Sequence, residues 1–302
     1  MALAVFLAWL SFCLLAGTWL GSLRPTWRRK FLSGYGRNRR VGIAFPEDSP
    51  RALTVLLLRQ TWFLFLAVFI CSVGHILLWT GPRLSQSTPN SIAVALANAA
   101  VAGLAIVMLL EFLSPFTFDG GEARVVTAED YVPAITIRLA QAVGVAGIAL
   151  PVGAVAIGAG PQHDAGLMWW EGLVLVPLAG SLCIFMGLRA ARRIVDVAPP
   201  TAPTLYLTDV LRAKALSLMV IAGSVSVALA YNSANAVLKG VALIGPVIPA
   251  WANAVGMFCA LMVLLSLVTV LTMIGNVGSR MRLRLWPQLE DGQRVELDAS
   301  AG

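Results

Sequence analysis

The chain has 302 residues, of which 58% are apolar and only 12% are charged, and its mean hydropathy is +0.81. A soluble domain carries about a quarter charged residues, so the composition excludes soluble globular, disordered and disulfide-rich secreted proteins. The net charge of +7 accompanies long apolar runs. Together these features predict an all-α fold, a polytopic bundle of membrane helices.

Seven apolar stretches are long enough to cross a bilayer, because about 20 helical residues span about 30 Å of hydrocarbon. In chain order, we predict transmembrane helices at residues 3–21, 58–79, 91–113, 135–159, 168–188, 213–231 and 247–275. They form one seven-helix domain over residues 1–276, and a short cytoplasmic tail follows over residues 277–302.

The first stretch lacks the charge order of a cleavable secretory signal. No basic residue precedes it, whereas Arg24, Arg28, Arg29 and Lys30 follow it. A signal peptide has its basic residues before the apolar core. We therefore expect a retained helix with its N-terminus outside.

The basic residues support the same orientation for the rest of the chain. With the N-terminus outside, 20 of the 22 Lys and Arg residues fall in inner segments, and only Arg83 and Lys239 fall outside. Because short cytoplasmic loops are enriched in Lys and Arg, we expect the C-terminus in the cytoplasm. Nineteen Arg against three Lys is typical of a GC-rich bacterium, which favours a multi-pass protein of the bacterial plasma membrane.

Two inner segments carry signals for a helix start. Thr127 followed by Asp130 predicts a capping box, and Thr208 with Asp209 predicts the N-terminus of the sixth span. A stiff extended connector is predicted just before it from three prolines: Pro199, Pro200 and Pro203.

Two features leave alternatives open. Residues 237–249 are apolar but interrupted by Gly and Pro, which is compatible with a re-entrant segment, although an outer loop folded over the bundle is simpler. Asn98 and Asn253 each lie between two alanines in similar positions of the third and seventh spans. This could mark a 3+1+3 duplication, but the other spans align poorly, and chance is the favoured explanation.

Small residues in two spans predict close helix packing. The fourth span is rich in Gly and Ala and has Pro151 at its middle, and Gly223, Ser224 and Ser226 lie in the sixth. Small residues three or four apart let helices approach closely, and a proline can kink a helix. The fourth span is therefore the predicted moving helix if any part of the protein moves.

The inventory of catalytic residues is thin. His75 and His163 both lie near predicted outer boundaries, and neither an H-E-x-x-H nor a G-x-S-x-G motif occurs. The four cysteines lie inside spans without metal-ligand spacing, and the last span holds no lysine for a retinal Schiff base. We therefore expect no enzyme and no cofactor or metal site.

Polar and charged residues near or within the spans are the remaining candidates. Neutral polar positions near mid-membrane are Asn98, Gln141 and Asn253, which can hydrogen-bond neighbouring helices. Arg59 and Glu111 each lie twenty residues from the outer end of adjacent antiparallel spans. Their matched depth predicts an ion pair at the inner boundary.

These features favour a non-catalytic subunit of a membrane complex, or a scaffold, that docks a protein partner through its cytoplasmic loops. The alternative is a transporter or facilitator of a neutral or lipid-like small molecule. The expected partners are the lipid bilayer, anionic lipid at the basic inner loops and a cytoplasmic protein. Nucleic acid is not expected, because the basic charge is spread over several segments with few aromatic residues interleaved.

Overall fold

The structure is a computed structural model, and it describes the chain in several ranges. These are residues 2–36, 43–44, 51, 54–55, 57–59, 61–62, 65–66, 69, 72–73, 123–125, 127–156, 173–174, 176–191, 194–196, 202–242, 250–285 and 295–296. The predicted third span, residues 91–113, lies outside the described residues, as does most of the second.

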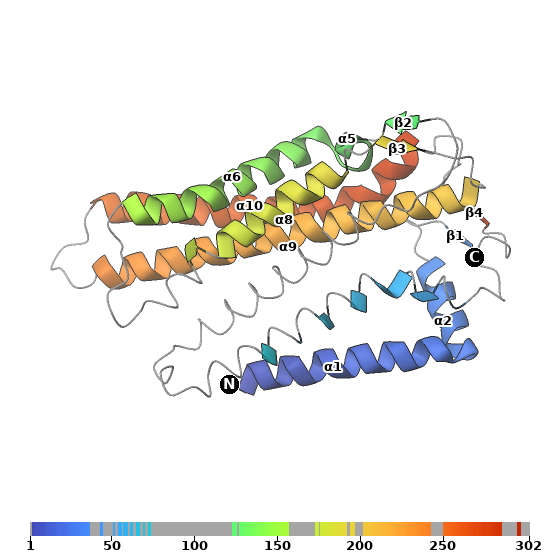
Figure 1. The fold of residues 1–302 in the computed structure, drawn as a ribbon. Helices are drawn as coiled ribbons and strands as arrows, with labels where there is room; N and C mark the ends of the chain where they lie inside the picture. The colour runs from blue at the N-terminus through green and yellow to red at the C-terminus, as the bar shows by residue number, and fades with distance from the viewer. Residues whose placement is uncertain are drawn as a thin grey trace.

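Helices dominate the described residues, as the composition predicts. The five longest are α1 (Ala2–Leu23), α6 (Ala134–Ala156), α8 (Val176–Ala190), α9 (Ala202–Ala242) and α10 (Ala250–Leu285). Two shorter helices are α2 (Pro25–Gly36) and α5 (Ala128–Tyr131). Four short strands are β1 (Ile43–Ala44), β2 (Ala123–Val125), β3 (Ile194–Asp196) and β4 (Val295–Glu296). Figure 1 shows the long helices lying roughly side by side.

Three helices of the described chain are long and apolar enough to cross a membrane. Their apolar parts are Ala134–Gly153, Asp209–Asn232 and Asn253–Ile274, and shorter apolar helices occupy Ala8–Leu23 and Val176–Arg189. The three long helices overlap the predicted fourth, sixth and seventh spans, and the two shorter ones overlap parts of the predicted first and fifth spans. The described fold is therefore helical, with three helices that suit a membrane by length and composition.

Helix α9 is much longer than the predicted sixth span, and this corrects two predictions. It begins at Ala202, so Pro203 lies in its first turn and Thr208 is not its cap. A proline is tolerated there because the first-turn N–H groups have no intrahelical partner. At its other end α9 continues to Ala242, so the first part of residues 237–249 is helix and not loop. Residues 243–249 lie outside the described residues.

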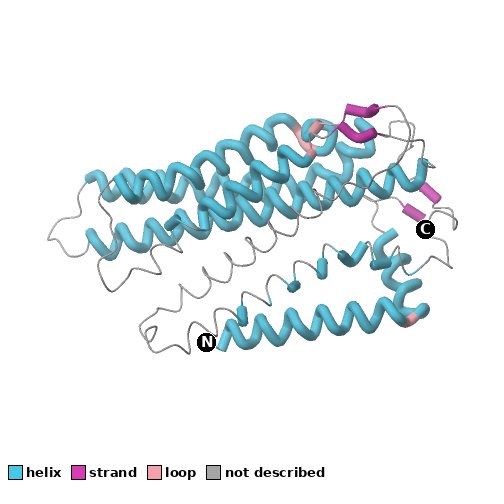
Figure 2. Tube along the Cα trace, in the orientation of Figure 1, coloured by secondary structure: helices cyan, strands magenta, loops and turns pink. Residues whose placement is uncertain are grey.

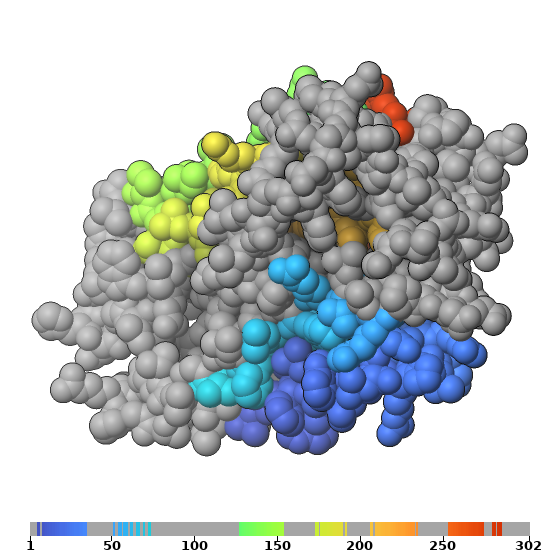
Figure 3. Space-filling view, turned by 45° about the vertical axis from the view of Figure 1, so that its right-hand side comes forward, coloured from blue at the N-terminus to red at the C-terminus, as the bar shows by residue number. Residues whose placement is uncertain are grey.

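The central helices pack around α9. It contacts α10 and α8 most extensively, and α6 in turn packs against α8, α10 and α9. Helix α1 lies beside the partly described residues 51–73, as the blue and cyan surfaces in Figure 3 show. The indole Nε1 of Trp62 donates a hydrogen bond to the Thr18 hydroxyl at 2.8 Å, which fixes this pair of segments.

Glycine contacts close the seam between α6, α8 and α9, as the small-residue pattern predicts. Gly180 and Gly223 meet backbone to backbone, since a Cβ built on Gly180 would lie 2.7 Å from the Gly223 carbonyl oxygen. A Cβ on Gly147 would lie 2.7 Å from Val227 and would collide with the Ser181 hydroxyl. That hydroxyl also lies 2.7 Å from the Gly144 carbonyl oxygen, to which it donates a hydrogen bond between α8 and α6.

One end of the molecule gathers basic residues, and we call it the basic end. There α1 ends, α2 and α5 lie, α9 begins and α10 ends (Figure 1), while the N-terminus lies at the opposite end and the C-terminus at this one. Its described basic side chains are those of Arg24, Arg28, Arg29, Lys30, Arg138, Arg189, Arg212, Arg280 and Arg284. Figure 2 shows both strand pairs at the same end.

Candidate functional site

The short helix α5 starts the polar structure at the basic end. The Thr127 backbone N–H donates to Asp130 Oδ2 at 2.7 Å, and the Thr127 hydroxyl lies 3.0 Å from the same oxygen. Asp130 is the third helical residue, so its carboxylate satisfies the N-cap donor as in a capping box. The predicted helix start at Thr127 is confirmed, and it places Tyr131 at the end of the single turn.

Tyr131 and Asp209 form a buried hydrogen bond between α5 and α9. The Tyr131 hydroxyl donates to Asp209 Oδ1 at 3.2 Å, across 78 residues of sequence. Tyr131 is 1% exposed and Asp209 is 2% exposed. Burial raises the pKa of the Tyr131 hydroxyl above its ordinary value, and the negative charge of Asp209 raises it further. The tyrosine is therefore a neutral donor to a buried acceptor.

Two arginines extend this contact. Arg212 lies one turn after Asp209 on α9, with Nη1 3.9 Å from Asp209 Oδ1 and a side chain 29% exposed. On α10, Arg280 donates from Nε to the Glu129 backbone carbonyl at 3.1 Å. Because Glu129 belongs to α5, this one-turn helix is bound on one side to α9 and on the other to α10. We call these contacts the α5 latch.

Strand pairs join the remaining segments of the basic end. Strands β2 and β3 pair antiparallel with Arg124 opposite Val195, so the segment before α5 is joined to the one after α8. Strands β1 and β4 pair in parallel with Ile43 opposite Val295, so the segment after α2 is joined to the end of the chain. Each pair uses backbone groups and links segments that lie far apart in the sequence.

The residues predicted as candidates are not brought together by the described structure. Arg59 lies exposed in the helical residues 57–59, and Gln141 is partly exposed on α6. Asn253 is exposed near the start of α10. Asn98 and Glu111 lie outside the described residues, so the predicted Arg59–Glu111 pair stays a prediction.

Sequence reasoning missed the Tyr131–Asp209 contact. The sequence predicts Asp209 at the N-terminus of the sixth span, whereas it lies inside α9 with an arginine three residues later. One sequence feature indicates that Asp209 is buried. It is an acidic residue just before an apolar helical run, with a basic residue one turn away, and a buried charge needs such a partner. Nothing in the local sequence around Tyr131 indicates its partner.

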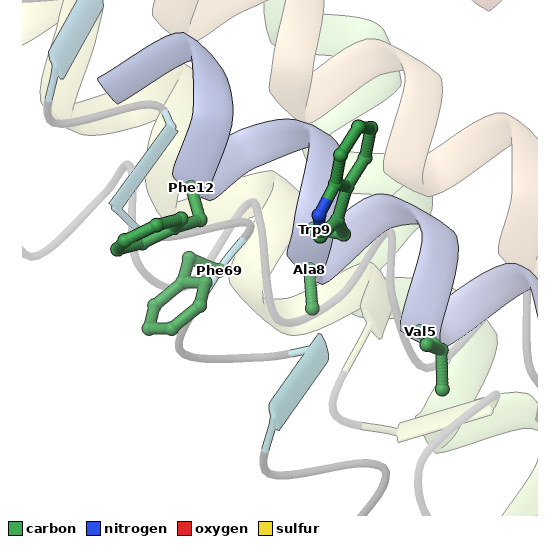
Figure 4. Close-up of a pocket in the computed structure, with 5 residues that line it drawn as sticks. All are labelled: Val5, Ala8, Trp9, Phe12 and Phe69. Atoms are coloured by element: carbon green, nitrogen blue, oxygen red, sulfur yellow. The ribbon is translucent and has the colours of Figure 1, made fainter. Parts of the chain in front are cut away.

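An apolar groove runs along the first half of α1. It has a volume of about 360 Å³ and is lined by Val5, Ala8, Trp9, Phe12 and Phe69. Figure 4 shows the Phe12 and Phe69 rings beside each other, with centroids 6.1 Å apart. Its lining carries no charged side chain, so the groove suits a hydrocarbon chain and offers no group for acid–base chemistry.

The described residues contain no group of three or more His, Cys, Asp and Glu side chains that could hold a metal ion. Comparison of the chain with protein-family models, with curated proteins and with solved structures finds no match.

Proposed function

We propose that the chain is a non-catalytic membrane subunit whose basic end faces the cytoplasm and docks a protein partner. In this proposal the chain crosses a bacterial plasma membrane seven times, with the N-terminus outside and the C-terminus inside. The observation that carries the proposal is the joining of separate inner segments into one structure by the α5 latch and the two strand pairs.

A docking surface must hold its geometry before the partner arrives, since ordering flexible loops on binding costs affinity. The latch and strand pairs supply that order. The glycine contacts between α6, α8 and α9 meanwhile pack the membrane part closely. The termini at opposite ends (Figure 1) agree with an odd number of crossings.

Site-specific photo-crosslinking tests the docking surface in cells. A photoreactive amino acid replaces Arg189 or Arg284, which are exposed at the basic end, or Val152 or Leu261, which are exposed on apolar helix faces. We expect both basic-end positions to crosslink to one and the same second protein, identified by mass spectrometry, and the apolar positions to yield no such adduct.

A variant that breaks the strand pairing completes this test. Val195→Pro removes a backbone donor from the β2–β3 pair and should weaken crosslinking at Arg189. Adducts of equal yield from apolar and basic-end positions, or none from the basic end, would contradict the docking proposal.

Reporter fusions test the topology independently of any partner. Fusions after Arg40, Arg193 and Arg282 should report the inside, and a fusion after Arg83 should report the outside. A fusion after Arg193 that reports the outside would overturn the proposed number of crossings.

The second candidate is a transporter or facilitator of a neutral or lipid-like molecule, and the apolar groove on α1 favours it. Replacing Ala8 with Trp would fill the groove. Uptake or flipping of lipid-like probes that falls in this variant, with crosslinking unchanged, would favour transport over docking.

A further inference from the structure

Helix α2 leaves α1 at a fixed turn. Arg24 separates the two helices, and Pro25 is the first residue of α2, a position where proline's missing N–H costs no hydrogen bond. The Trp27 ring covers Gly21, since a Cβ on that glycine would lie 2.7 Å from the ring. Figure 1 shows α2 turning sharply away from the axis of α1. Only glycine leaves room for this arrangement.

The two faces of α2 differ in polarity. Leu32 is 3% exposed, and the Trp27 and Phe31 rings stack with centroids 5.3 Å apart. Arg29 and Lys30 are exposed together with the small polar residues near them on the opposite face. The apolar face packs on the protein, since Leu32 belongs to the buried core and Phe31 packs against it, so the exposed basic face is the one that can meet lipid headgroups.

The position of α2 along the chain puts it at the level of lipid phosphates. The 22 residues of α1 rise by about 33 Å, which matches a hydrocarbon thickness of about 30 Å. Helix α2 therefore begins where the hydrocarbon ends. Residues 1–46 contain no Asp or Glu, so the charged side chains within this stretch are all basic.

We propose that α2 binds the phosphate headgroup of anionic phospholipid in the inner leaflet, through a basic cluster on and before its first turns. The cluster comprises Arg24, Arg28, Arg29 and Lys30. The Trp27 ring, which covers Gly21, lies at the boundary between headgroups and chains, where amphipathic indole rings are favoured. This inference rests on the orientation in the proposed function, with the basic end inside, and does not require a protein partner.

Native mass spectrometry of the purified full-length chain in mild detergent tests the inference. Phosphatidylglycerol and phosphatidylcholine are titrated separately, and the affinity of each is measured. The test variant removes three charges from α2: Arg28→Gln, Arg29→Gln and Lys30→Gln. The matched control removes three exposed charges elsewhere at the inner segments: Arg51→Gln, Arg189→Gln and Arg284→Gln.

We expect the unaltered chain to prefer phosphatidylglycerol. The α2 variant should bind it about a hundredfold more weakly, because each basic side chain near anionic lipid strengthens binding about fivefold. The control should change it by less than about threefold, because none of its charges belongs to the α2 cluster. Equal loss in both variants, or no preference for phosphatidylglycerol, would overturn the inference.

Two further arms separate the causes of failure. A charge-conserving variant, Arg28→Lys with Arg29→Lys, should retain the preference; loss there would overturn a charge-based site. Excess inorganic phosphate should leave bound phosphatidylglycerol in place, and displacement would overturn the choice of a lipid over free phosphate.

A thiol-labelling experiment tests separately on which side of the membrane α2 lies. In a cysteine-free background, Ser33→Cys on the exposed face of α2 should react with a membrane-impermeant thiol reagent only in inverted vesicles. Reaction in intact cells would refute the orientation and this inference together. Inward orientation without a phosphatidylglycerol preference would refute this inference alone.

Discussion

The contact between Gly223 and Gly180 gives the sharpest stability prediction. In Gly223→Ala, the new methyl group would lie 2.6 Å from Ile184 Cγ1 and closer still to the Gly180 carbonyl oxygen. Carbon atoms in contact prefer about 3.5–4.0 Å, so α8 and α9 must separate by about 1 Å. The Gly180 carbonyl belongs to the backbone and cannot rotate away as a flexible side chain would.

The cost follows from two opposing effects. Overpacking a closely packed site costs about 1–3 kcal/mol. A separation of about 1 Å between α8 and α9 also weakens the dispersion attraction of their other contacts. Replacing a helical glycine with alanine returns up to about 1 kcal/mol through helix propensity. We expect Gly223→Ala to lose about 1–2 kcal/mol in the free energy of unfolding.

Gly153→Ala is the matched control, because nothing lies within 4 Å of a Cβ at that position of α6. It should leave the free energy of unfolding unchanged or raise it by up to about 1 kcal/mol. Both variants are compared by titrating the purified chain from mild detergent into sodium dodecyl sulfate, with helix content as the signal. Equal stabilities of the two variants would refute the close packing of α8 against α9.

Three other predictions use the same titration. Tyr131→Phe should cost about 1–3 kcal/mol, because it leaves the buried Asp209 acceptor without this donor. Burial raises the pKa of Tyr131 above 10.0, so the contribution of this residue to the free energy of unfolding is present below pH 10 and falls as the pH rises further. The same loss of stability at alkaline pH in the Tyr131→Phe chain would refute this. Tyr231→Phe removes a 2.8 Å hydrogen bond to a carbonyl of α6 and should cost about 1 kcal/mol; no loss would show that the bond contributes nothing. Arg59→Glu and Glu111→Arg should each destabilise the chain and the double swap should recover stability, whereas a double swap equal to the sum of the two would show that they are not partners.

The helices of this fold could be predicted from the sequence because the bilayer fixes their minimum length. Apolar runs of about 20 residues meet that requirement wherever they occur, and α6 (Ala134–Ala156) begins within one residue of its predicted start at 135. Helix α9 shows the limit of this reasoning. Its first turns extend into a polar segment, where Pro203 and Asp209 are compatible with either a loop or a helix.

For the tertiary contacts, the sequence predicts the kind of contact but not which residues make it. The glycine and serine spacing of α6 and α9 predicts close approach, but it does not name Gly180 on α8 as the partner of Gly223. The Tyr131–Asp209 bond joins residues 78 apart, and neither residue carries a local pattern that points to the other. Such pairings are set by how helices rotate about their axes, which apolar composition leaves undetermined, because in a membrane helix all faces are apolar.

The two parts of the described molecule are closed by different physical means. Among the central helices, backbone meets backbone across glycine, and lipid tails offer no hydrophobic gain for separating or joining them, so shape decides the packing. At the basic end, water competes for every polar group. The segments there are held together by the buried Tyr131–Asp209 hydrogen bond and by backbone pairing between strands. A carrier that alternates access would have to open one of these closures in each cycle. A docking subunit, as we propose for this chain, would keep both closures shut throughout.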